Sequence, residues 1–385
     1  MKSFRRTTAL ILLIAGVIIS GNNKAIAKTD EGGDVLKSFK VNKGGTLKVS
    51  INSGDITIDT WNKNEVNVKI EDVDEDQYNQ LKISQSGSNV TVQYNGSGYN
   101  NSSDVKISVP AEYNLDLQTN QGEISVRGNL KGTCQAATGG GDINLSSITG
   151  YVNVKTNGGE ITVGNTYGDL TVSTSGGDLY IGNITGKGDI RTNGGTISLG
   201  NVGKYLFVKT MGGDITAGDI GGNADVSTMG GDISVKKVSG SASLKTNGGD
   251  VKILGSSGSV IAKTFGGDLS LSNLNGTVDA STSSGDIYVE LRSTGGGSSK
   301  LESMNGSVRL YIDPNLKATI YANVRLSGWS GDDDERPISS EFPAKDYKSS
   351  KYSGEVNAIY LINGGGDNIT IKTVNDGIEL KKLKK

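Results

Sequence analysis

The chain has 385 residues, of which 57 are glycine and only four are proline, and its 39 basic side chains nearly balance its 41 acidic ones. Because it has no histidine and a single cysteine, Cys134, the sequence excludes Ser-His-Asp and Cys-His catalysis, histidine-ligated metal sites, iron–sulfur clusters and internal disulfides. The four prolines exclude a collagen-like or proline-rich chain, and the 34 % hydrophobic content predicts a lean, aliphatic core.

Residues 1–27 have the pattern of a cleaved secretory signal peptide. Three basic residues precede an apolar stretch over residues 9–19, and an Ala-Ile-Ala cleavage signal ends at Ala27. The alternative is an uncleaved anchor, and no later stretch is apolar enough to be a transmembrane span. Cleavage leaves 35 basic against 41 acidic side chains, a net charge of −6, which disfavours nucleic-acid binding. We therefore expect export to the periplasm, the cell surface or the extracellular space.

Residues 28–118 contain strand-like alternation of apolar and polar residues without a fixed repeat. The segments 47–51, 56–58 and 66–70 show it most clearly. Their irregular spacing predicts an N-terminal β cap rather than regular repeats, because the ends of repeat arrays are atypical and cover the exposed edge.

Residues 119–299 contain the main feature of the sequence, a Gly-Gly-Asp-like unit that recurs with a constant step of 18 residues. Its second glycine is Gly141, Gly159, Gly177, Gly195, Gly213, Gly231, Gly249, Gly267 and Gly285. Between these turns the apolar residues alternate with period two, so each repeat holds two short strands and two turns. We attribute the turn glycines to a need for positive φ.

One such unit cannot bury its apolar face alone, but stacked units can. The sequence therefore predicts an all-β fold, a parallel β-solenoid of about nine regular 18-residue coils with atypical N- and C-terminal β caps. Crossover preference favours a right-handed β-helix. Residues 300–385 form the expected C-terminal cap, with a polar insertion at about 328–355 that includes an acidic run over residues 332–335, and residues 28–385 form one continuous solenoid domain.

The chain resembles a bacterial β-strand-repeat putative-adhesin family of unknown function and, more loosely, the GIN-type adhesin head domain. The resemblance lies in the opening Ser53-Gly54-Asp55-Ile56-Thr57-Ile58 with Trp61, in Val109-Pro110, in the Gly-Gly-Asp coils and in the closing segment 369–380. It covers about residues 34–381 and implies a β-solenoid in an exported bacterial protein. It defines no catalytic residues and no cofactor, and it specifies fold far better than function.

An acidic residue follows the second glycine in eight of the nine coils, and Thr196 stands in the ninth. These residues are Asp142, Glu160, Asp178, Asp214, Asp232, Asp250, Asp268 and Asp286. A stacked row of carboxylates is a candidate metal site, for example for Ca²⁺, which prefers several oxygen ligands. The favoured interpretation is structural: each carboxylate accepts backbone N–H groups of its own Gly-Gly turn. We expect weak, millimolar divalent binding at most, and no metal cofactor.

A threonine lies three residues before the second glycine in all nine coils. The set is Thr138, Thr156, Thr174, Thr192, Thr210, Thr228, Thr246, Thr264 and Thr282. Because this position continues the inward side of the strand alternation, we expect a buried hydroxyl ladder rather than an outward, ice-binding array. Cys134 shares an inward column with Val152 and Leu170, so we interpret it as a buried small residue rather than a reactive thiol.

Two outward columns are left for partners. One is polar and carries Asn144, Thr162, Tyr180, Ser198, Thr216, Ser234, Lys252, Ser270 and Tyr288; the other is partly basic and carries Lys155, Arg191, Lys209, Lys245 and Lys263. The coil length is too even for the long loops that build a catalytic cleft on a β-helix. We therefore predict an exported, non-catalytic adhesin or structural module, whose partner is a surface glycan or an envelope protein. The alternatives are a periplasmic scaffold and a carbohydrate-binding or carbohydrate-active β-helix.

Overall fold

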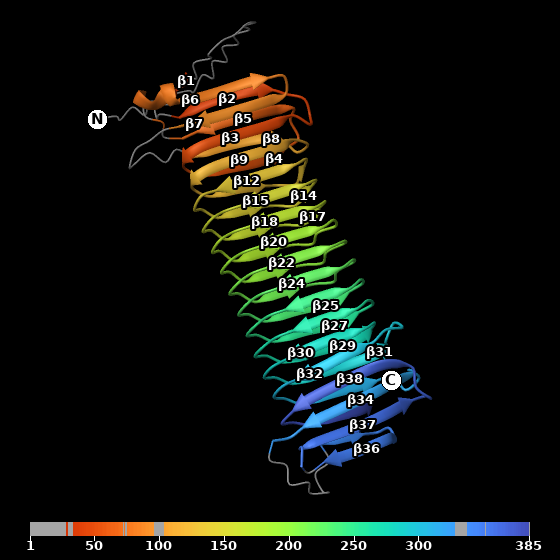
Figure 1. Ribbon diagram of the computed structural model, residues 1–385. Coiled ribbons are helices and arrows are strands. Elements are labelled where there is room, and N and C mark those ends of the chain that lie inside the picture. Colours follow the sequence, from red (N-terminus) through yellow and green to blue (C-terminus); the bar gives the residue numbers. More distant parts are fainter. Residues whose placement is uncertain are drawn as a thin grey trace, which may run out of the picture.

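A computed structural model describes residues 28–29, 34–71, 73, 75–95, 104–327, 337–350 and 352–384. The expected signal peptide at residues 1–27 and the acidic run at 332–335 lie outside these ranges. In the described ranges the chain is a long stack of strands that runs from the N-terminal part of the sequence (red, top) to the C-terminal part (blue, bottom) in Figure 1. The all-β, mainly parallel solenoid predicted from the repeat is confirmed.

Two 18-stranded sheets form the long sides of the stack. In spatial order, the first, sheet A, consists of β1 (Lys28–Thr29), β2 (Val35–Lys40), β5 (Glu65–Ile70), β8 (Val105–Pro110), β4 (Ile56–Trp61), β10 (Ile124–Arg127), β13 (Ile143–Leu145), β16 (Ile161–Val163), β19 (Leu179–Ile181), β21 (Ile197–Leu199), β23 (Ile215–Ala217), β25 (Ile233–Val238), β27 (Val251–Ser256), β29 (Leu269–Asn275), β31 (Ile287–Ser293), β33 (Val308–Ile312), β39 (Ile378–Lys382) and β35 (Ile338–Ser340).

Sheet B runs beside it in the same direction. In spatial order, it consists of β6 (Leu81–Ser86), β7 (Asn89–Tyr94), β3 (Thr46–Ser53), β9 (Asn114–Gln121), β12 (Cys134–Thr138), β15 (Val152–Lys155), β18 (Leu170–Ser173), β20 (Gly188–Arg191), β22 (Leu206–Lys209), β24 (Ala224–Ser227), β26 (Ala242–Lys245), β28 (Val260–Lys263), β30 (Val278–Thr282), β32 (Ser299–Ser303), β38 (Asp367–Val374), β34 (Ala318–Arg325), β37 (Glu355–Ile362) and β36 (Ala344–Ser350). These pairings run in one line, so the sheet is open and has β6 and β36 at its edges.

A third, short column of strands lies between the sheet A strand and the sheet B strand of each coil, where the alternation predicted only a turn. It begins with β11 (Leu130–Lys131), β14 (Ile148–Thr149) and β17 (Thr166–Tyr167) and continues as single bridges between equivalent residues down to Val238. Its inward residues, such as Ile148 and Ile184, are buried. Each coil therefore contributes a third inward position to the core.

The core follows the period-two pattern of the two main sheets. Every regular coil places the same positions inward; β16, for example, buries Ile161 and Val163 and leaves Thr162 half-buried between them. The inward residues of both sheets belong to one continuous hydrophobic cluster. Strands of successive coils pair in register, as Ile161 does with Leu179, so apolar residues at equivalent positions lie directly above one another. The 18-residue repeat therefore forms continuous columns of aliphatic side chains.

At each end of the solenoid, the strands are not stacked in the order in which they occur in the sequence. Strands β3 and β4 stack directly on β9 and β10, although β5 to β8 lie between them in the sequence. At the other end β38 and β39 pair with β32 and β33, ahead of β34 and β35. Antiparallel partners, including β6, β2 and β36, then cover the outermost coils; the 3-10 helix η1 (Glu75–Gln80) precedes β6. Within the insertion, the described residues form β35 and β36.

Candidate functional site

The nine repeat threonines are buried at the corner that follows each sheet B strand, with only 1 to 6 % of each side chain exposed. Each hydroxyl donates a hydrogen bond of 2.8 to 3.2 Å to the carbonyl of a turn glycine one coil earlier, as Thr156 does to Gly141. In most coils it also accepts the N–H of the second glycine of its own turn, as Thr156 does from Gly159. The threonine therefore ties two successive turns together inside the corner.

The second glycine of each turn is required by close contact between coils. A Cβ at Gly159 would lie 2.0 Å from the carbonyl oxygen of Gly141, and equivalent distances in the other coils are 1.9 to 2.3 Å. The explanation by positive φ is wrong for these turns, because none of the nine glycines has a positive φ. Positive φ does occur at the mid-repeat Gly150. Glycine is used at the corner because only a hydrogen atom fits against the backbone of the preceding coil.

The acidic ladder connects neighbouring coils. One carboxylate oxygen of each aspartate accepts the backbone N–H of the residue at the same position in the next coil, at 2.7 to 2.8 Å. The expectation that each carboxylate serves its own turn was wrong, because the parallel stack places the next coil's N–H closer to it. Asp55 makes the same bond to Glu123, which extends the ladder into the N-terminal coils. The ladder thus satisfies backbone donors at the corner.

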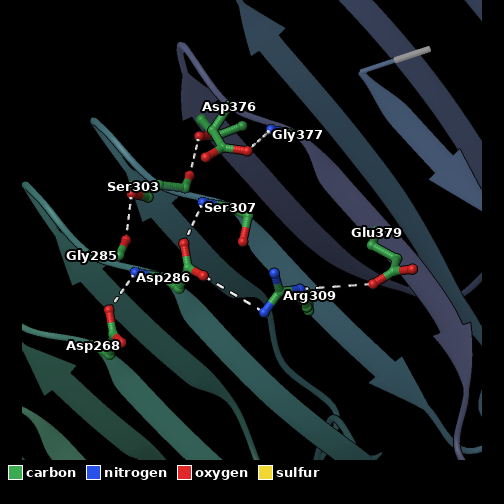
Figure 2. Close-up of polar contacts among 11 residues, drawn as sticks. Asp268, Gly285, Asp286, Ser303, Ser307, Arg309, Asp376, Gly377 and Glu379 are labelled. Carbon is green, nitrogen blue, oxygen red and sulfur yellow. Dashed lines mark hydrogen bonds and ion pairs between the residues drawn. The ribbon is translucent and has the colours of Figure 1, made fainter. Parts of the chain in front are cut away.

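Figure 2 shows how the ladder ends at the C-terminal cap. Asp286 donates its backbone N–H to Asp268 and accepts the N–H of Ser307 at 2.8 Å. Its other oxygen lies 3.6 Å from the Arg309 guanidinium, which also approaches Glu379 at 3.8 Å. The last aspartate of the ladder therefore has a cationic partner on the cap.

No group of three or more histidine, cysteine, aspartate or glutamate side chains in the described ranges is arranged to hold a metal ion. One oxygen of each aspartate named above is already engaged with a backbone N–H. Cys134 is buried in sheet B, and burial raises the pKa of its thiol to about 12. A thiol in that environment stays protonated at neutral pH and is a poor nucleophile.

An exposed apolar ridge, which the sequence analysis missed, lies one residue after the threonine column. It consists of Met211, Met229, Phe265 and Met304, which are 42, 51, 66 and 61 % exposed. Equivalent positions in the other coils carry Gly139, Asn157, Ser175, Asn193, Asn247 and Ser283, of which Asn247 and Ser283 stand between members of the ridge. The signal was available, since every methionine after Met1 stands in this one column.

Lysines of the partly basic column lie beside this ridge. Lys245 and Lys263 pair in register on β26 and β28, and together with Phe265, Glu302 and Met304 they line an open hollow of about 380 Å³. Lys263 also forms an ion pair with Asp279 at 2.9 Å. The structure thus places apolar and cationic side chains on the same outward corner of the rod.

A second hollow, of about 370 Å³, lies where β4 ends near the N-terminal cap. We call it the Trp61 hollow. It is lined by Lys43, Trp61, Asn62, Lys63, Asn64, Pro110, Ala111, Glu112, Asn129, Leu130, Lys131 and Thr149. These residues come from separate parts of the sequence that the out-of-order stacking of β4, β8 and β11 brings together. No motif in the sequence indicated this hollow.

The family model that describes Toastrack DUF4097 matches residues 62–220 and 206–380, so the chain belongs to this family. No curated protein matches it. Solved structures similar to it include a putative cell adhesion protein from Clostridium sporogenes (7 % identity, 92 % of this chain and 100 % of that chain, TM-score 0.19). Others are putative adhesins from Bacteroides fragilis (12 %, 91 % and 97 %, TM-score 0.18) and Parabacteroides distasonis (15 %, 73 % and 91 %, TM-score 0.23). The family assignment rests on the sequence match.

Proposed function

We propose that this protein is an exported, non-catalytic adhesive module that contacts a partner surface along the side of its solenoid. The observation that carries the proposal is the apolar ridge beside the lysines of β26 and β28. Exposed methionine and phenylalanine side chains are unfavourable in water and adapt well to a partner. The absence of histidine from the sequence and the even coil length support a role in binding rather than in catalysis.

Export is supported by the signal-peptide pattern of residues 1–27. In the described ranges no helix is long and apolar enough to cross a membrane. The first test is protease treatment of intact producing cells, followed by immunoblotting, with a periplasmic protein as the leakage control. We expect the band to disappear while the control stays intact. Cleavage only after the outer envelope is opened contradicts the adhesive role and supports an envelope scaffold instead.

The second test addresses the ridge itself. In the variant Met211→Ser/Met229→Ser/Phe265→Ser/Met304→Ser each apolar side chain becomes a residue already found in that column, so the fold should be retained. We expect its binding to target cells to fall at least tenfold. The control, Tyr180→Ser/Leu254→Ser, removes two exposed apolar side chains from sheet A and should bind normally. Equal loss in both variants, or in neither, contradicts a role for the ridge.

A further inference from the structure

The Trp61 hollow contains a fixed aromatic surface. Trp61 is half-buried, and its indole N–H donates a hydrogen bond of 2.8 Å to the carbonyl of Glu65. Its own carbonyl accepts the N–H of Ala111 at 2.9 Å. The ring is therefore held in one orientation, with part of its surface open to the hollow. A preorganised aromatic ring of this kind can pack against the C–H face of a flat or ring-shaped ligand at low entropic cost.

Three lysines line the hollow together with this ring. The Lys63 ammonium lies 4.6 Å from the centre of the indole ring, in cation–π contact with it. The Lys131 ammonium lies 3.4 Å from the Glu112 carboxylate, and Lys43 completes the set. Glu112 is the one acidic side chain among those that line the hollow, so the lining carries a net charge of about +2, although the whole chain is acidic. This local excess favours an anionic ligand.

Asparagine side chains are the third kind of group in the lining of the Trp61 hollow, after the aromatic ring and the lysines. Asn62, Asn64 and Asn129 line the same hollow, and all three are exposed. Each side-chain amide both donates and accepts hydrogen bonds, which is what a ligand with many hydroxyl groups requires. An aromatic platform, cations and amides around one open hollow match the three kinds of group on an acidic sugar: a C–H face, a carboxylate or sulfate, and hydroxyls.

We propose that the Trp61 hollow binds acidic polysaccharide, with one sugar ring packed against Trp61 and its anionic groups held by Lys43, Lys63 and Lys131. Lys63 then moves from the indole face to the sugar anion, which costs little because the contact is exposed. The site lies near the N-terminal cap, far in the stack from the ridge, so this binding does not depend on the proposed adhesive role. It can occur whether the protein is surface-exposed or enclosed in the envelope.

The test is titration calorimetry of the full chain with two acidic probes, an oligogalacturonate and a heparin-derived oligosaccharide. The neutral control is the fully methyl-esterified oligogalacturonate of the same length. We expect at least one acidic probe to bind at least tenfold more tightly than the neutral one, and this binding to weaken as salt is raised from 0.1 to 1 M. Failure of both acidic probes, or equal binding of the esterified form, overturns the proposal.

Two triple lysine variants test whether the acidic probe binds in the Trp61 hollow or is attracted by positive charge anywhere on the surface. Lys43→Gln/Lys63→Gln/Lys131→Gln should lower the affinity at least tenfold. The matched control Lys187→Gln/Lys204→Gln/Lys237→Gln removes the same charge from exposed positions outside both hollows and should change the affinity less than twofold. All six lysines lie on the surface, so both variants should fold. Equal losses in the two variants overturn the proposal in favour of diffuse charge attraction.

Tryptophan fluorescence reports on the ring directly. The chain has two tryptophans, so in a Trp329→Phe background Trp61 is the only one. We expect the emission of Trp61 to change in proportion to the occupancy of the hollow by the acidic probe. In Lys43→Gln/Lys63→Gln/Lys131→Gln the same change should require an at least tenfold higher probe concentration. Binding seen by calorimetry without any change in Trp61 emission places the ligand elsewhere and overturns the assignment.

Discussion

Replacing Gly159 with alanine tests the close packing between coils. The new Cβ would lie 2.0 Å from the Gly141 carbonyl oxygen, whereas carbon and oxygen normally approach to about 3.3 Å. The neighbouring Gly158 provides a matched control, because a Cβ there lies 3.7 Å from the Gly140 carbonyl oxygen. Neither glycine has a positive φ, so backbone strain does not distinguish the two substitutions.

The difference in stability follows from these distances. Gly159→Ala must push two hydrogen-bonded coils apart, and overpacking of this kind costs about 1 to 3 kcal/mol, with the upper end expected here. Gly158→Ala creates an ordinary contact and removes unfolded-state freedom, which stabilises by about 0.4 to 1 kcal/mol. We therefore expect the two variants to differ by about 3.5 to 4 kcal/mol, or several hundredfold in the local folding equilibrium.

The assay combines urea unfolding with native-state hydrogen exchange. Stacked repeats open locally, so hydrogen exchange should be measured at an amide close to the substitution. The Ile161 amide is suitable, because it donates a hydrogen bond to the backbone carbonyl of Asp178 in the next coil. We expect faster exchange there in Gly159→Ala and unchanged or slower exchange in Gly158→Ala. Equal stability of the two variants would refute the steric explanation for the second glycine.

Three further predictions concern the ladders and the buried thiol. Thr246→Val leaves the Gly231 carbonyl and the Gly249 N–H without their hydroxyl partner and should destabilise by about 1 to 3 kcal/mol in urea unfolding. Asp250→Asn keeps an acceptor oxygen for the Asp268 N–H while removing one stacked charge, so its melting temperature should match or exceed that of the unaltered protein. The pKa of Cys134 is raised from 9.0 to about 12 by burial, so native protein should resist thiol reagents at pH 8. Because that pKa is raised on folding, the thiol's contribution to stability is complete below pH 9 and is lost as the pH rises toward 12; melting temperature against pH measures this loss.

Each of these has a control. Thr246→Ser keeps the hydroxyl and should cost less than Thr246→Val; the reverse order contradicts the hydrogen-bond explanation. Asp250→Ala removes the acceptor and should melt lower than Asp250→Asn, and equal melting would show that the bond contributes little. Cys134→Ala should lose less stability at alkaline pH than the unaltered protein does. Rapid reaction of Cys134 with thiol reagents in the native protein would contradict its burial.

The regular coils could be predicted because the information is local and repeated. Equal 18-residue spacing stacks identical positions, and alternation identifies the inward residues, such as Ile161 and Val163. The inward threonine column was visible for the same reason. Its bond partners were not, because a carbonyl 15 residues away reaches Thr156 only after the coils have stacked.

The sequence by itself determined the repeat, the two main strands of each coil and the aliphatic columns, since these depend on periodicity alone. Only the tertiary structure decided the cross-coil bonds of the acidic ladder, the third short column and the strand order at both ends. It also decided the Trp61 hollow, which joins residues as distant as Lys43 and Thr149. The physical reason is that periodicity identifies which positions stack but not which atoms bond across coils, and that pairing between distant, non-repeating segments follows from the packing of the whole chain.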